Sequence, residues 1–182
     1  MQPQPVDSYI RAQGITCAVI NLAANPALAW LLNRHMNFVP LWGGNSIVVD
    51  TAVTCLVLSL LVALFTASGV RQALHNGRLE TADGYSRTGR LLAHLPKQAW
   101  SLGLLLGLGA ACVLTPLTFG LFHALGLSGL PLGWFALFKA MYTAPLGFVL
   151  TRWVILRQLL DRPDKKLPLG LHKSPDGGKL SQ

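Results

Sequence analysis

Residues 46–68 read SIVVDTAVTCLVLSLLVALFTAS, and Asp50 is their only formally charged side chain. About 20 residues of α-helix cross the hydrocarbon core of a bilayer, because each residue adds 1.5 Å along the helix axis. The core of a soluble protein rarely requires so long an uninterrupted apolar run. The stretch therefore predicts a membrane-spanning helix that carries a carboxylate one turn inside its first end.

The whole chain has the composition of a membrane protein. Of its 182 residues, 52% are hydrophobic and 12% are charged, and the mean hydropathy is +0.46. Soluble proteins carry about 25% charged residues. The net charge of +8 comes from basic residues beside the apolar segments, without the interleaved aromatic and basic residues of a nucleic-acid surface. We therefore expect a lipid bilayer as partner and no nucleic acid.

Three further apolar segments divide the rest of the chain. Residues 98–138 contain no Asp, Glu, Lys or Arg; they are too long for one span, and glycine and proline at 126–131 mark the break. Residues 27–29 (ALA) resemble a signal-peptide cleavage site, but Asn21 and Asn25 split the apolar core, which favours a retained span. We predict an all-α bundle of four transmembrane helices in up-down-up-down order, at about residues 12–32, 46–68, 98–122 and 131–156.

The segments outside the spans are polar. Residues 1–10 are expected to be a disordered N-terminus, residues 11–160 the transmembrane domain, and residues 161–182, rich in Pro, Gly and Lys, a disordered basic cytoplasmic tail. The second helix should continue to about His75, where Asn76-Gly77 is a typical stop. Residues 87–95 have the pattern of a short amphipathic helix on the membrane surface.

Lysine and arginine alternate between the two sides of the predicted bundle. Arg11 precedes the first span, only Arg34 follows it, the connection at 71–97 has five, and the end from Arg152 onward has seven. The connection between the third and fourth spans has none. Basic residues stay on the cytoplasmic side. Both termini are therefore predicted to be cytoplasmic, in a multi-pass protein of the bacterial inner (cytoplasmic) membrane.

Polar side chains of the predicted helices fall at one depth near the outer ends. At 1.5 Å per residue, Asp50 lies roughly 6 Å inside its span and Lys139 roughly 12 Å inside the fourth, and helical side chains lean towards their own N-terminus. The lysine therefore reaches towards Asp50. The same predicted layer includes Asn25, Thr54, Tyr142, Thr115 and Thr118.

The Asp50 and Lys139 pair has three interpretations from the sequence. An ionised side chain near the bilayer centre costs about 2.5–3.5 kcal/mol or more, which pairing offsets. The pair could line a polar, proton-responsive cavity open to the outer face. It could instead be an ion pair that sets helix register, or two side chains that reach the head groups separately.

Other residues point to packing rather than chemistry. Gly103-x-x-x-Gly107 predicts close approach of another helix, either within the chain or in a homodimer. Cys17, Cys55 and Cys112 lie inside spans without metal-site spacing and are read as packing residues. No histidine lies at mid-depth, as a b-type haem would require, and the histidines of the outer loops lack an accompanying carboxylate. We expect no cofactor, no metal site and no catalytic residue.

Three runs carry a resemblance to known proteins: WLLNR at 30–34, VPLWGGNSIVVDT at 39–51 and GLSGLPLGWFALFKA at 126–140. Together they resemble a group of small, uncharacterised bacterial integral membrane proteins with four spans, some of them labelled permease. The resemblance extends over most of residues 15–157. It implies four spans, and both Asp50 and Lys139 lie in the resembling runs.

Two functions from different classes follow. The first is a small permease or transport-related component, acting as a homo-oligomer or with an unknown membrane partner, in which Asp50 and Lys139 bind or gate. The second is a non-catalytic scaffold or accessory membrane subunit whose ion pair is structural. A membrane enzyme is a third interpretation, but no motif nominates a nucleophile.

Overall fold

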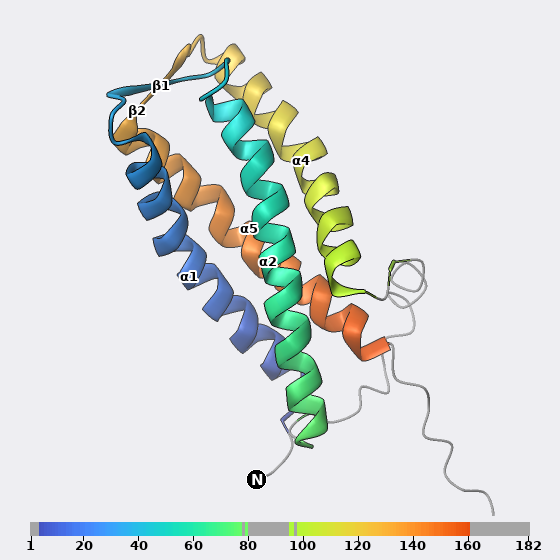
Figure 1. Ribbon diagram of the computed structural model, residues 1–182. Helices are drawn as coiled ribbons and strands as arrows, with labels where there is room; N and C mark the ends of the chain where they lie inside the picture. The colour runs from blue at the N-terminus through green and yellow to red at the C-terminus, as the bar shows by residue number, and fades with distance from the viewer. Residues whose placement is uncertain (1–3, 78, 80–94, 97, 161–182) are drawn as a thin grey trace, which may run out of the picture.

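The computed structural model describes residues 4–77, 79, 95–96 and 98–160 (Figure 1). Within them, four helices are long and apolar enough to cross a membrane, which confirms the predicted number of apolar helices. The elements in chain order are α1 (Val6–Asn33), β1 (Phe38–Pro40), α2 (Ile47–His75), α4 (Ala99–Ala124), β2 (Gly129–Pro131) and α5 (Leu132–Leu160).

Local chemistry sets both ends of α2. The Ser46 hydroxyl caps the first turn by accepting a hydrogen bond of 3.3 Å from the backbone N–H of Val49. The helix ends at His75, Asn76 follows as the C-cap, and Gly77 has a φ of +65°, a conformation that favours glycine. The predicted continuation of this helix to His75 is confirmed.

The helix α1 begins earlier than the sequence predicted. Residues 6–10, expected to be part of a disordered N-terminus, form its first turn and the start of its second. Val6 and Ile10 are buried in a cluster with Val70 of α2 and Ile155 of α5. Burial of these apolar side chains favours the ordered helix, since removing apolar surface from water or head groups is favourable.

Two short strands join the connections at one end of the bundle, called here the β end (Figure 1). β1 pairs with β2 in antiparallel register, with Val39 opposite Leu130, and Leu41 donates a backbone hydrogen bond of 2.7 Å to Ser128. Val39 and Leu41 are buried against the adjoining helix ends. This pair of strands, called here the strap, holds the connection between α1 and α2 beside the connection between α4 and α5. The opposite end of the bundle, where α1 begins, is called here the N-terminal end.

Small residues determine which helices touch. A side chain at Gly147 of α5 would meet the Asn21 amide at 2.7 Å, and one at Gly14 of α1 would meet the Phe148 ring at 2.7 Å. α1 therefore packs closely on α5. Gly103 and Gly107 of α4 have no space for a Cβ against the α2 backbone. Of the two alternatives for these glycines, the structure has packing within the chain.

The connection from α2 to α4 is described only in part. Buried Arg157 of α5 donates hydrogen bonds to the Leu95 carbonyl from Nε at 3.0 Å and from a terminal nitrogen at 2.9 Å. The sequence had counted this arginine only as a cytoplasmic charge. Residues 87–94 of the predicted amphipathic helix and the predicted disordered tail at 161–182 lie outside the described residues.

Candidate functional site

The structure joins Asp50 of α2 to Lys139 of α5. Lys139 Nζ lies 2.8 Å from Asp50 Oδ1, and the lysine side chain is 5% exposed while the aspartate side chain is 24% exposed. The ammonium also lies 5.8 Å from the centroid of the Phe135 ring, within cation–π range. The lysine is thus held inside the bundle, and the carboxylate is the more accessible charge of the pair.

Thr54 and Tyr142 lie beside the carboxylate. The Thr54 hydroxyl is one turn after Asp50 and donates to its Oδ2 over a long 3.5 Å. The Tyr142 hydroxyl, on α5, lies near Thr54 and Asp50. Its oxygen is buried and has no hydrogen-bond partner among the described residues. Both carboxylate oxygens thus already accept a hydrogen bond, Oδ1 from Lys139 and Oδ2 over a long distance from Thr54, and the Tyr142 oxygen is buried beside them.

Asn25 enters the site through a ladder of amides on α1. Its side-chain N–H donates to Asn21 Oδ1 at 2.8 Å, and the Asn21 amide donates to the Cys17 carbonyl at 2.8 Å. The Thr143 hydroxyl donates to the Lys139 carbonyl at 2.7 Å and lies 3.4 Å from the Asn21 carbonyl. Asn21 is thus a site residue that the sequence analysis missed. Its spacing of four from Asn25 was the available signal.

α4 contributes less to the layer than predicted. Thr118 is buried, and the Thr115 hydroxyl is buried without a hydrogen-bond partner in the described chain. No hydrogen bond joins either threonine to Asp50 or Lys139 within the described residues. The two threonines lie apart from the ion pair because α4 packs through Gly103 and Gly107 on another side of α2. The polar layer is therefore built by α1, α2 and α5.

A groove of about 710 Å³ runs between α1 and α2, with Lys139 of α5 in its lining. It extends along α2 from Asp50 to Gly69, a helix length of about 28 Å, which is close to the roughly 30 Å of a bilayer's hydrocarbon core. Most of the wall is apolar and exposed, including Ile20, Leu28, Val53, Val57, Leu61 and Phe65. The groove thus opens sideways, towards the surroundings of the bundle.

The polar groups are unevenly distributed along this groove. Asn21, Asn25, Asp50, Thr54 and Lys139 lie in its part nearer the β end. Beyond Thr54, the α2 wall is apolar for three turns, until Thr66. The groove therefore has the ion pair nearer the β end, an apolar middle on the α2 side, and the uncharged polar side chains of Tyr9, Gln13, Thr16 and Thr66 towards the N-terminal end.

The histidine, cysteine and acidic side chains are dispersed over the described part of the chain. No group of three or more His, Cys, Asp or Glu lies close enough there to hold a metal ion. His123, in the last turn of α4, stacks on the Phe119 ring with centroids 5.8 Å apart.

The fold and the site define a membrane-embedded protein of apolar helices with an ion pair in the lining of a lateral groove. No protein-family model, curated protein or solved structure matches the chain. The resemblance to small bacterial four-span proteins is therefore an interpretation of sequence pattern alone.

Proposed function

We propose that the protein is a small permease-like component of a bacterial inner membrane, with Asp50 and Lys139 as its substrate-binding or gating pair. The observation that supports this most is the position of the pair in the lining of the groove. Asp50, the more exposed member of the pair, lies at the wall of this groove. Ionisable groups within membrane helices are costly and commonly line pathways.

The proposed arrangement has four spans in up-down-up-down order and both termini in the cytoplasm. Two observations support it. The strap between β1 and β2 places the connection with a single arginine, Arg34, beside the connection without one. Arg11, Arg71 and Arg152 lie towards the opposite end of their helices. This asymmetry is typical of helices with basic residues on the cytoplasmic side.

The substrate class that the groove favours is an amphiphile. Its head group would lie at the Asp50 carboxylate, the Asn25 amide and the Thr54 hydroxyl, which line the groove, and its hydrocarbon chain along the exposed wall of α2. A lateral groove admits a molecule from the surrounding lipid without a water-filled pore. Because one side of the groove is open, a second copy of the chain or another membrane protein would be needed to enclose the route.

The test uses a photoreactive alkylamine with a diazirine in its chain, added to the purified protein in lipid nanodiscs. We expect cross-links at Val57 and Leu61 in the wild type and a several-fold loss in Asp50→Asn. Cross-links spread evenly over all exposed apolar residues would instead show bulk lipid contact and would contradict the proposal.

A scaffold or accessory subunit is the second candidate, and one observation favours it. Lys139 is almost fully enclosed where α1, α2 and α5 meet, as a residue that sets helix register would be. Lys139→Met, Asp50→Asn and the double variant separate the two functions. If the double variant is present at the wild-type protein level and also complements a deletion strain, the pair is structural. If the double variant restores the protein level but does not complement the deletion, the pair is a functional site.

A further inference from the structure

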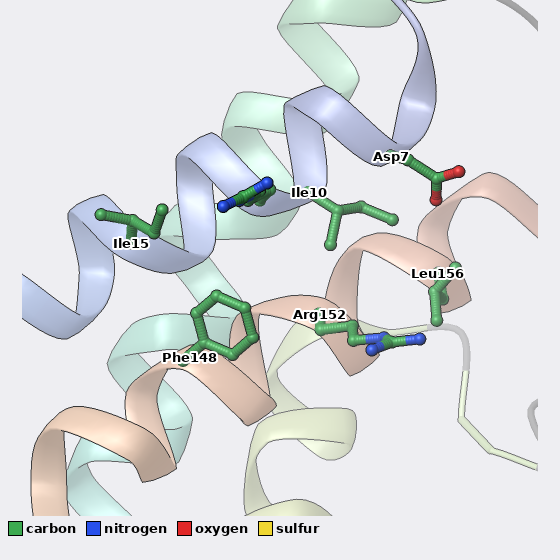
Figure 2. Close-up of a pocket in the computed structure, with 7 residues that line it drawn as sticks. Asp7, Ile10, Ile15, Phe148, Arg152 and Leu156 are labelled. Atoms are coloured by element: carbon green, nitrogen blue, oxygen red, sulfur yellow. The ribbon is translucent and has the colours of Figure 1, made fainter.

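A second hollow, of about 290 Å³, lies between α1 and α5 near the N-terminal end of the bundle (Figure 2). Its charged lining consists of Arg11 and Asp7 on α1 and Arg152 on α5. Its apolar lining consists of Ile10, Ile15, Phe148 and Leu156. None of these residues belongs to the polar layer of Asp50 and Lys139.

We propose that this hollow binds the phosphodiester head group of an anionic phospholipid, with the start of an acyl chain on its apolar floor. The two arginines come from different helices and are both exposed. Neither makes a hydrogen bond or ion pair with another residue in the described ranges. Guanidinium groups bind phosphate oxygens through paired N–H donors, and both arginines line this one hollow.

The charge of the hollow matches a single negative charge. Arg11 and Arg152 contribute +2 and Asp7 contributes −1, which leaves a net charge of +1 on the lining. A phosphodiester carries one negative charge, whereas a phosphomonoester carries between one and two at neutral pH. The Asp7 carboxylate has contacts of its own, and the charges that line the hollow are balanced by one phosphodiester.

The deepest residues that line the hollow are apolar. In Figure 2 the Phe148 ring and Ile15 lie towards one end, and the Arg152 guanidinium and Asp7 lie towards the other. Asp7 is in the first turn of α1, and Ile15 lies eight residues further, about 12 Å deeper along the axis. Ile15 and Phe148 thus lie deeper than either arginine and form an apolar floor, which a free anion would not require, whereas Ile10 and Leu156 lie at the level of the charged groups.

A general excess of basic residues does not account for this arrangement. Arg71 of α2 is exposed near the same end of the bundle but does not line the hollow. Basic pockets between membrane helices on the cytoplasmic side are recurrent sites for anionic lipid head groups. In the orientation proposed above the hollow is such a pocket, whereas Arg71 belongs to the diffuse positive charge around it.

The test is native mass spectrometry of the full-length protein with added phosphatidylglycerol or phosphatidylcholine of identical chains. We expect the wild type to retain phosphatidylglycerol preferentially and the double variant Arg11→Gln/Arg152→Gln to lose that preference by roughly tenfold. The matched control Arg34→Gln/Arg71→Gln removes the same charge outside the hollow and should keep the preference. An equal loss in both double variants would overturn the proposal, because the lipid would then be responding to net charge.

Two further arms identify the occupant. Ile15→Trp fills the apolar floor and should weaken lipid retention, whereas Val19→Trp, one turn along α1 and outside the hollow, should not. Inorganic phosphate added in excess should leave the bound lipid in place. Displacement of the lipid by phosphate, together with no effect of Ile15→Trp, would assign the hollow to a free anion and overturn the lipid assignment.

Discussion

Lys139 donates a 2.8 Å hydrogen bond to Asp50 across the interface of α5 and α2, and the two side chains differ about fivefold in exposure. This inequality makes the two members of the pair energetically different. Asp50, if left alone, can still reach the groove and any water or head group within it. Lys139, if left alone, is an ammonium enclosed by the bundle. Removing one partner of a buried pair costs about 3–5 kcal/mol, chiefly through the charge that remains.

The first prediction concerns the order of the single variants. Asp50→Ala should destabilise the protein by about 3 kcal/mol, because it leaves Lys139 enclosed without a counter-charge. Lys139→Met should cost less, because the remaining carboxylate is partly exposed. Unfolding in mixed micelles by titration with a denaturing detergent measures both. The reverse order would mean that Asp50, and not Lys139, is the enclosed charge.

The second prediction concerns the close packing of α4 on α2. A Cβ at Gly107 would lie 3.0 Å from the Leu56 Cα and 3.2 Å from the Cys55 carbonyl oxygen, both backbone atoms that cannot yield easily. Gly107→Ala should therefore destabilise the bundle by about 1–3 kcal/mol, measured by the same unfolding titration.

Gly109 on the same helix supplies the control for that measurement. A Cβ there meets nothing within 4 Å, so Gly109→Ala should be neutral or stabilise the helix by up to about 1 kcal/mol. Equal effects of the two substitutions would show that helix propensity, and not contact with α2, governs both.

The third prediction concerns the width of the groove. Val57→Trp places a large ring in the apolar wall and should reduce cross-linking of the photoreactive alkylamine several-fold, without loss of folded protein. Val113→Trp, at an exposed position of α4 outside the groove, is the matched control and should leave the yield unchanged. Cross-linking that survives Val57→Trp would place the probe elsewhere on the bundle.

The depth of a residue in the membrane could be predicted from the sequence, but which helices are neighbours could not. Hydropathy and the rise per residue give depth, which is why the span of α2 and the approach of Lys139 to Asp50 could be derived. Which helices are neighbours depends on side-chain shape. The contacts of Gly14 with Phe148 and of Gly147 with Asn21 leave no pattern that hydropathy detects. The groove between α1 and α2 follows from those contacts, so it was not predicted.

The strap at the β end was missed for a different reason. Three residues are too few for an alternating pattern to stand out, and Pro40 and Pro131 argue locally against strands. The pairing of the two strands depends on tertiary contacts instead. Val39 is buried among the helix ends, and Gly129 has no side chain to collide with Phe38 and Val39 of β1. Only the location of both segments in connections between spans was accessible from the sequence.

The fourth prediction tests the strap with a disulfide. Val39 and Leu130 are directly opposite in the antiparallel register, where Cα atoms lie about 4.5–5.5 Å apart, within the range that a disulfide spans. After replacement of the three native cysteines, Val39→Cys/Leu130→Cys should form an intramolecular disulfide on mild oxidation. Val39→Cys/Leu127→Cys, which is out of register, should form it much more slowly. Equal rates would mean that the two connections are not held together.

The last prediction tests the proposed orientation of the protein in the membrane. This orientation decides which leaflet the ion pair and the two-arginine hollow each face. Ser128 is exposed beside the strap, and Asn76 is exposed after the last turn of α2, towards the opposite end of the bundle. If basic residues remain cytoplasmic, an impermeant thiol reagent added to intact cells should label Ser128→Cys and miss Asn76→Cys until the membrane is permeabilised. The same cysteine-free background and equal labelling in detergent provide the control. Labelling of Asn76→Cys alone would invert the molecule, and the two-arginine hollow would then face the outer leaflet.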